Sequence, residues 1–353
     1  MSKEVVKKTS KDRIRDKILS ELIQYGKPTM FDRKMLDIKP LSNRKHDINV
    51  SVVRGLDTDI KELEIYERIK KVANCVITAK ANKSAIILFI GGHVIRSGVQ
   101  KYLIDLMEKG YISCLAMSGA GIIHDYELAL VGATTENVAH YIKNGQFGLW
   151  KETGMLNDII NEAYKKNNSV GMGEAIGRAI ESGDFPHKCL SLLVAGYRLG
   201  IPVTIHVGIG YDIIHEHPNC DGAATGALSY NDFLKLASVV QRLEGGAVMN
   251  FGSAVMAPEV FLKALSMARN VASRKGQGIK RFTALVCDLH NIPNDFSKEA
   301  PKDSSAYYFR PWKTMLVRTV ADGGKSYYVR GKHADTIPGL WAAINEAENK
   351  LKE

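Results

Sequence analysis

The clearest indication of the fold is the segment Ser84-Ala-Ile-Ile-Leu-Phe-Ile90, which Gly91-Gly92 follows directly. A continuous apolar run of this kind is typical of a parallel strand that is buried on both faces. Further strands are expected at about residues 111–117, 202–207, 246–250, 282–288, 314–320 and 326–330. Helices are expected at about residues 59–80, 94–109, 187–199, 229–243, 258–273 and 338–352, with a mainly helical insertion at 134–183. This alternation predicts an α/β fold, a mostly parallel, Rossmann-like sheet that helices cover on both faces.

The positive charge of the chain is concentrated near its N-terminus. The 353 residues carry a formal net charge of +10, and residues 1–46 hold 13 Lys and Arg against 6 Asp and Glu. Apolar residues at helical spacing predict a helix over residues 3–25 of this segment. The remainder is nearly balanced, whereas nucleic-acid-binding domains more often carry a basic stripe across a folded face. We therefore expect a basic helical arm and connector at 1–50, one α/β domain at 51–353, and no nucleic-acid partner.

Neither a membrane span nor an export signal is expected. No apolar run reaches the ~18 residues that a transmembrane helix needs, and the first residues lack the apolar core of a signal peptide. The five cysteines are scattered without a CxxC pair, which is typical of reduced thiols. The sequence therefore predicts a cytoplasmic protein with no membrane partner.

Three of the expected strands end in small residues. These turns are Gly91-Gly92, Ser118-Gly119-Ala120-Gly121 and Gly252-Ser253. In open parallel sheets, ligands bind beyond the carboxyl ends of the strands, where glycine lets backbone amides approach a phosphate or a ribose. Any one of the turns could be a tight strand-to-helix connection and nothing more. Three in one chain favour a nucleotide cofactor.

The densest group of polar side chains follows the strand expected at 202–207 and extends from His206 to Gly222. Its His215-Glu216-His217 segment, with nearby carboxylates, has ligand types that zinc or iron accepts. However, no helical pair of ligands four residues apart and no second cluster accompany it. We therefore favour a polar substrate pocket, in which imidazoles and carboxylates bind or deprotonate an amine, and expect no metal.

A further polar cluster runs from Asp303 to Lys313 and contains Trp312. If Lys313 is partly buried beside Trp312, the loss of hydration lowers its pKa and frees a neutral amine for Schiff-base chemistry. The alternative is an ordinary surface lysine, and the residues alone leave both open.

At these positions the chain resembles the deoxyhypusine synthase family, and in particular its bacterial and archaeal deoxyhypusine synthase-like branch. Segments 88–99 and 117–125 are similar to the first two cofactor loops of that family in order and spacing. Ile201-Pro202-Val203 resembles the strand that leads into its acidic pocket, and segment 250–265 resembles its glycine-rich fourth loop. Trp312-Lys313 falls where the family has a Trp-x-Lys with the reactive lysine. The resemblance covers about residues 60–350.

The resemblance implies a transferase that uses NAD. In that family NAD removes hydride from spermidine, and the resulting imine passes its aminobutyl group to the active lysine. A second amine then displaces this lysine, and the retained NADH reduces the product. The acceptor is a protein lysine in true deoxyhypusine synthases and a small diamine in related enzymes. Family members are homotetramers with sites shared between subunits, so a homotetramer is expected here.

The resemblance and the glycine-rich turns together give a set of candidate site residues. The catalytic candidates are Lys313, as the imine-forming nucleophile, and His215. The cofactor-binding candidates are Gly91, Gly92, His93, Ser118, Gly119, Ala120, Gly121, Asp125, Asp212, Gly252, Ser253, Asp303 and Ser304. The substrate-binding candidates are His124, His217, Asp221, Glu259 and Trp312.

The sequence also departs from the family in ways that leave alternatives open. Pro258-Glu259-Val260-Phe261 stands where the family has a catalytic histidine, and the Trp-x-Lys spacing is shortened to Trp-Lys. Fewer acidic residues mean weaker charge pairing with a triamine. One alternative is therefore a homospermidine-type or guanidino-amine condensing enzyme with a small diamine acceptor. Another is a non-catalytic NAD-binding protein of the same fold.

Overall fold

A computed structural model of the chain describes residues 9–24, 30–56 and 64–352. The chain divides into two compact units, residues 1–36 and residues 37–353. The first contains α1 (Ser10–Gln24) and the short helix η1 (Arg33–Met35). A capping box begins α1, because the backbone N–H of Asp12 donates to Thr9 Oγ1 and that of Thr9 donates to the Asp12 carboxylate. The expected helix at 3–25 is thus present from Ser10, and residues 3–8 and 25 lie outside the described residues.

The second unit is built on a six-stranded parallel sheet with the order β5-β3-β2-β6-β7-β8. The order of the strands reverses between β2 and β6. From β2 the chain adds β3 and β5 on one side, and it then adds β6, β7 and β8 on the other side. Such a reversal creates a crevice at the carboxyl edge of the sheet. The strands are β2 (Ile86–Ile90), β3 (Cys114–Ser118), β5 (Val203–His206), β6 (Ala247–Phe251), β7 (Thr283–Asp288) and β8 (Lys325–Arg330).

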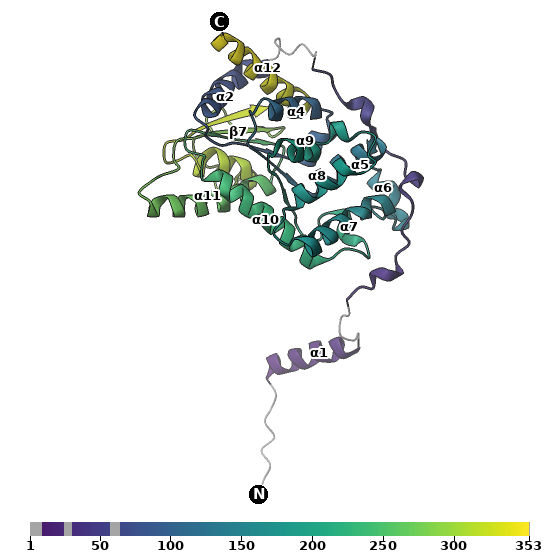
Figure 1. Cartoon of the computed structure of the whole chain (residues 1–353). Coiled ribbons are helices and arrows are strands. Elements are labelled where there is room, and N and C mark those ends of the chain that lie inside the picture. Colours follow the sequence, from purple (N-terminus) through teal and green to yellow (C-terminus); the bar gives the residue numbers. More distant parts are fainter. Residues whose placement is uncertain (1–8, 25–29, 57–63, 353) are drawn as a thin grey trace. The chain divides into compact units, whose positions relative to one another are not determined.

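Helices cover both faces of the sheet, which confirms the predicted α/β class. Successive residues of β2 show why its sequence is apolar throughout: Ile86, Leu88 and Ile90 join one core, whereas Ile87 and Phe89 join the other. Figure 1 shows α10 and α11 on the opposite side of the sheet from α4 and α9. The longer helices are α2 (Glu64–Ala81), α4 (Gln100–Glu108), α5 (Gly119–Val131), α7 (Lys151–Lys166), α8 (Met172–Ser182), α9 (Leu192–Leu199), α10 (Gly222–Val240), α11 (Met256–Arg274) and α12 (His333–Lys352).

Residues 37–50, which the sequence analysis placed in the arm, pack against the α/β unit. Leu41 is buried, and Lys39 forms a parallel β-bridge with Trp150. A two-stranded antiparallel sheet joins β1 (Ile48–Asn49) to β4 (Ala133–Thr134). The remaining short helices are η2 (Leu41–Asn43), η3 (Val50–Val52), α3 (Gly92–Arg96), α6 (Val138–Tyr141), η4 (Ile142–Asn144), η5 (Lys188–Leu190), η6 (Ile213–Glu216) and η7 (Ser305–Tyr308).

Several predicted elements differ from the structure, and two of them differ most clearly. The expected strand at 314–320 is wrong, because Pro311–Arg318 forms a π-helix, η8. Most of its residues are buried, and a short apolar run cannot be assigned to strand or helix from periodicity alone; Pro311 at its first turn favours a helix. The expected helix at 94–109 is broken into α3 and α4, because Gly98 between them has a φ of 74°. No helix within the described ranges 9–24 and 64–352 is long and apolar enough to cross a membrane.

Candidate functional site

Two glycine turns meet at the point where the sheet order reverses. A Cβ added to Gly91, after β2, would lie 2.4 Å from the carbonyl oxygen of Gly252, after β6. Gly252 has a φ of +67°, and a Cβ there would lie 2.2 Å from Nε2 of His333 at the start of α12. The close approach of the two loops therefore requires glycine at position 91, whereas the positive φ and the nearby His333 ring favour glycine at position 252. In doubly wound sheets this crevice receives the dinucleotide.

Asn250, in β6, fixes the second turn and connects it to η8. Its Nδ2 donates to the carbonyl oxygen of Ser253 at 2.9 Å, and its Oδ1 accepts from the Ser253 N–H at 3.1 Å. The same Nδ2 lies 3.5 Å from Sδ of Met315. The turn predicted to bind the cofactor is thus joined through one buried amide to the helix that carries Lys313.

Lys313 is buried, the first of the two environments that the sequence left open. Its side chain is 7% exposed, and its Nζ lies 3.5 Å from the centre of the Tyr307 ring. A hydrogen bond with Lys313 lowers the pKa of Tyr307. The adjacent Trp312 donates from Nε1 to the carbonyl oxygens of Phe296 and Lys298, at 3.2 and 3.1 Å, and so anchors the preceding loop to this helix.

Asp212 lies at the N-terminus of α5. A Cβ on Gly119 would lie 2.0 Å from Asp212 Oδ2, so glycine is needed for the carboxylate to reach the helix. Burial raises the pKa of Asp212 to about 6, although a hydrogen bond from the backbone N–H of Ala120 acts in the opposite direction. Asp212 is 8% exposed, and its Oδ2 has no hydrogen-bond partner within the described chain. A buried carboxylate oxygen in this state is suited to accept a hydrogen bond from a bound amine.

His215 is held in a single tautomer. Its Nδ1 accepts hydrogen bonds from the backbone N–H groups of Gly210 and Asp212, both at 3.3 Å. The proton of the neutral ring is therefore on Nε2, which is buried and has no hydrogen-bond partner among the residues described. Burial lowers the pKa of His215. His215 is thus a hydrogen-bond donor through Nε2.

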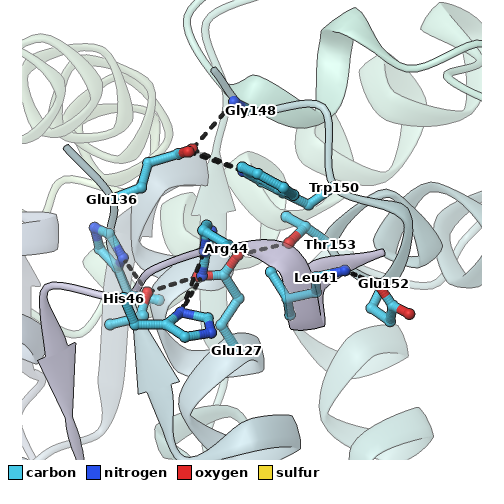
Figure 2. Close-up of polar contacts among 11 residues, drawn as sticks. Leu41, Arg44, His46, Glu127, Glu136, Gly148, Trp150, Glu152 and Thr153 are labelled. Atoms are coloured by element: carbon cyan, nitrogen blue, oxygen red, sulfur yellow. Dashed lines mark hydrogen bonds and ion pairs between the residues drawn. The ribbon is translucent and has the colours of Figure 1, made fainter. Parts of the chain in front are cut away.

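A chain of hydrogen bonds orients His124 on α5. Arg44 donates to both carboxylate oxygens of Glu127, at 2.9 and 2.7 Å, and Thr153 donates to the same group at 2.6 Å (Figure 2). Thr134 Oγ1 also donates to Glu127, at 2.7 Å, so its contact of 2.9 Å with His124 Nδ1 is one in which the imidazole donates. Nε2 of His124 is therefore the unprotonated nitrogen. Burial lowers the pKa of His124 to about 4, which keeps the ring neutral at pH 7.

A cavity of about 290 Å³ lies between α5 and the segment that carries Asp212. Glu136, on its wall, accepts hydrogen bonds from Trp150 Nε1 and from the backbone N–H of Gly148, as Figure 2 shows. Arg96, at the end of α3, also lines it. The cavity lining comprises Arg44, Arg96, Ala120, Ile123, His124, Glu127, Thr135, Glu136, Val138, Phe147, Tyr211, Asp212 and Ile213.

Several predicted site residues have their polar atoms engaged elsewhere in the fold. Asp125 accepts hydrogen bonds from Ser191 Oγ and from the backbone N–H of Leu192, and so caps α9. His217 Nε2 lies 2.9 Å from the carbonyl oxygen of Gly148. Asp221 caps α10, Ser304 caps η7, and Glu259 forms ion pairs with Arg310 and Lys263. His93 and Asp303 are exposed.

The structure adds functional candidates that the sequence analysis did not identify. These are Arg44, Arg96, Glu127, Asn250 and His333. Asn250 directly precedes the Phe251-Gly252-Ser253 turn, so its position was a usable signal. Arg44 and Glu127 lie 83 residues apart and have no local pattern that joins them. Within the ranges 30–56 and 64–352 no group of three or more His, Cys, Asp or Glu could hold a metal ion.

No family model matches the chain. A deoxyhypusine synthase-like protein of Elusimicrobium minutum (strain Pei191) is 23% identical over 246 residues, which is 61% of this chain and 62% of that protein. The chain resembles the deoxyhypusine synthase-like proteins. The matched region spans about three fifths of the length of that curated relative.

Solved structures with a related arrangement include three proteins of different description. Unliganded AgrE has a TM-score of 0.48 and 15% identity, covering 81% of this chain and 33% of its own. A candidate LOR/SDH protein of Methanococcus maripaludis S2 has a TM-score of 0.46 and 14% identity, covering 83% and 73%. A candidate deoxyhypusine synthase of Entamoeba histolytica has a TM-score of 0.39 and 9% identity, covering 81% and 90%.

Proposed function

We propose that this chain is an NAD-dependent transferase that moves an aminoalkyl group from a polyamine, such as spermidine, to an acceptor amine through an imine on Lys313. The observation that carries the proposal is the connection between the glycine turns expected to bind NAD and the helix that carries Lys313. The Gly91 and Gly252 turns meet where the sheet order reverses, and Asn250 joins the second turn to the helix of the buried Lys313.

The residues at the sheet reversal fit a dinucleotide. A side chain at Gly91 would collide with the Gly252 carbonyl group, and one at Gly252 would collide with His333. Asn250 holds Ser253 in place. Gly91, Gly92, His93, Gly252 and Ser253 would hold NAD, which supplies a hydride acceptor when bound. The burial of Lys313 supports this role, because desolvation is one of the ways in which enzymes activate an imine-forming lysine. A homotetramer in the cytoplasm is part of the same proposal.

Product analysis tests this function. The full chain is incubated with NAD and each of spermidine, putrescine and agmatine, singly and in pairs, and products are identified by mass spectrometry. The expected result is a condensed polyamine together with a diamine leaving group, with no accumulation of free NADH at 340 nm. Release of NADH in proportion to turnover indicates a simple dehydrogenase instead. The absence of both products and NADH supports the non-catalytic alternative.

A further inference from the structure

The charged side chains that line the cavity beside α5 differ in whether the protein itself provides partners for their polar atoms. Arg44 and Glu127 form an ion pair in which both side chains are only 1% exposed, so each compensates the other. Both carboxylate oxygens of Glu136 accept hydrogen bonds from Trp150, and one also accepts from Gly148. Glu136, Arg96 and Asp212 form no ion pair in the described chain, but only Arg96 and Asp212 also keep a buried polar atom without a hydrogen-bond partner there.

Arg96 is a cation with unused hydrogen-bonding capacity. Among residues 30–56 and 64–352, its only hydrogen-bond partner is Nε2 of His93, at 3.3 Å, and no carboxylate forms an ion pair with it. Its Nε is buried and has no acceptor within the same part of the chain. A guanidinium in this state is suited to bind a carboxylate through two parallel hydrogen bonds.

Asp212 provides the opposite charge in the same cavity. Its Oδ2 is buried without a partner in the described structure. Apolar side chains line the same cavity: Ile123, Val138, Phe147 and Ile213. The cavity thus presents one anion-binding group, one cation-binding group and an apolar wall, in a volume of about 290 Å³ that suits a small molecule.

We propose that this cavity binds an amino acid, with the ligand carboxylate on Arg96 and a ligand ammonium group on Asp212. The inference rests on the proposed function in one respect, since it takes the ligand to be one of the two amine substrates of that reaction. A ligand with ammonium groups at both ends would place a positive charge beside the Arg96 guanidinium, which forms no ion pair in the described chain, and this repulsion costs affinity in a partly buried site. A carboxylate on one end of the amine removes this cost.

Matched pairs of ligands test the inference, because an amino acid and its decarboxylated amine differ only in the carboxylate. The probes are ornithine with putrescine, and arginine with agmatine, titrated calorimetrically into the full chain. We expect each amino acid to bind at least about ten-fold more tightly than its paired amine, as a charge-assisted bidentate contact provides. Equal affinity within the pairs, tighter binding of the amines, or no binding of any probe overturns the inference.

Variants assign the effect to the two residues. Arg96→Gln should lower the affinity for ornithine about ten-fold or more and raise the affinity for putrescine, and Arg96→Lys should give an intermediate loss for ornithine. Arg274→Gln, at an exposed arginine of α11, is the matched control and should change neither the affinity for ornithine nor the affinity for putrescine. Asp212→Asn should weaken both ligands. An Arg96→Gln protein that folds with wild-type thermal stability and keeps the ornithine preference contradicts the assignment.

The binding measurement is independent of the proposed chemistry. If spermidine and NAD modify Lys313 but ornithine does not bind, only the assignment of the cavity ligand fails. If ornithine binds through Arg96 but Lys313 is never modified, the transferase proposal fails and the cavity assignment stands.

Discussion

The Arg44 guanidinium binds both carboxylate oxygens of Glu127, at 2.9 and 2.7 Å, across 83 residues of sequence. This ion pair fastens residues 37–50 to α5 on the wall of the cavity (Figure 2). It also sets the position of Glu127, which Thr134 connects to His124. The segment before the α/β sheet therefore contributes directly to the candidate site.

Removal of Arg44 should destabilise the protein strongly. Arg44→Met leaves the Glu127 carboxylate buried without its counter-charge, which typically costs about 3–5 kcal/mol of unfolding free energy. Glu127→Gln added to Arg44→Met removes that charge but keeps a hydrogen-bonding amide, and should restore about 1–3 kcal/mol. Urea unfolding followed by circular dichroism measures both. A double variant no more stable than Arg44→Met contradicts the idea that an unpaired buried charge causes the loss.

Enlargement of Gly91 should impair cofactor binding. Gly91→Ala places a Cβ against the Gly252 carbonyl oxygen and forces the two turns apart, so the affinity for NAD should fall about ten-fold or more. Gly226→Ala on α10 is the matched control, since a Cβ there meets nothing within 4 Å. Calorimetric titration with NAD measures both. Wild-type affinity in Gly91→Ala means that the dinucleotide does not bind at this turn.

The affinity for amines should depend on pH through Asp212. Its pKa is raised to about 6, and only the charged carboxylate attracts an ammonium group, so the affinity for putrescine and ornithine should fall below about pH 6. His124, with a pKa of about 4, stays neutral over most of this range, and burial also lowers the pKa of His215. Burial raises the pKa of Glu136 on the same wall, so Asp212→Asn is needed for the assignment. Titrations from pH 5 to 8 should show the decrease in the wild type and not in that variant.

His124 should carry its proton on Nδ1 at neutral pH. Long-range ¹H–¹⁵N NMR of the imidazole is expected to show the Nδ1–H tautomer, and no protonation of the ring above about pH 5. Because the folded-state pKa lies below the value of 6.5 for an unfolded chain, the unfolded state binds more protons between these values. The contribution of His124 to stability is therefore lost as pH falls from about 6.5 to 4, and His124→Gln should weaken this pH dependence of unfolding. An Nε2–H tautomer contradicts the hydrogen-bond chain through Thr134.

The sequence predicted those features that depend on neighbouring residues. The Ile86–Ile90 strand and the Gly91 turn follow from a local apolar run closed by glycine, and the structure confirms both. Asp212 was a candidate because it lies in a polar segment after a strand. Its contact with α5, however, depends on Gly119, which lies far away in sequence.

The remainder of the candidate site depends on contacts that local patterns do not encode. The network of Arg44, Glu127, Thr134 and Thr153 joins four separate segments, and no spacing rule connects them. Lys313 was placed at the start of a strand because the short apolar run Met315-Leu316-Val317 follows it, and both strands and buried helices show such runs. The Arg44–Glu127 ion pair and the helix that carries Lys313 therefore depend on tertiary packing, which local sequence patterns do not show.

The transferase proposal is tested most directly at Lys313. The full chain is incubated with NAD and spermidine, treated with borohydride, digested and examined by mass spectrometry. The proposal predicts a reduced aminobutyl adduct on the peptide that contains Lys313. The adduct should be absent without NAD, and Lys313→Arg should abolish both the adduct and turnover. An unmodified Lys313 in a preparation that converts spermidine, or undiminished turnover by Lys313→Arg, would contradict it.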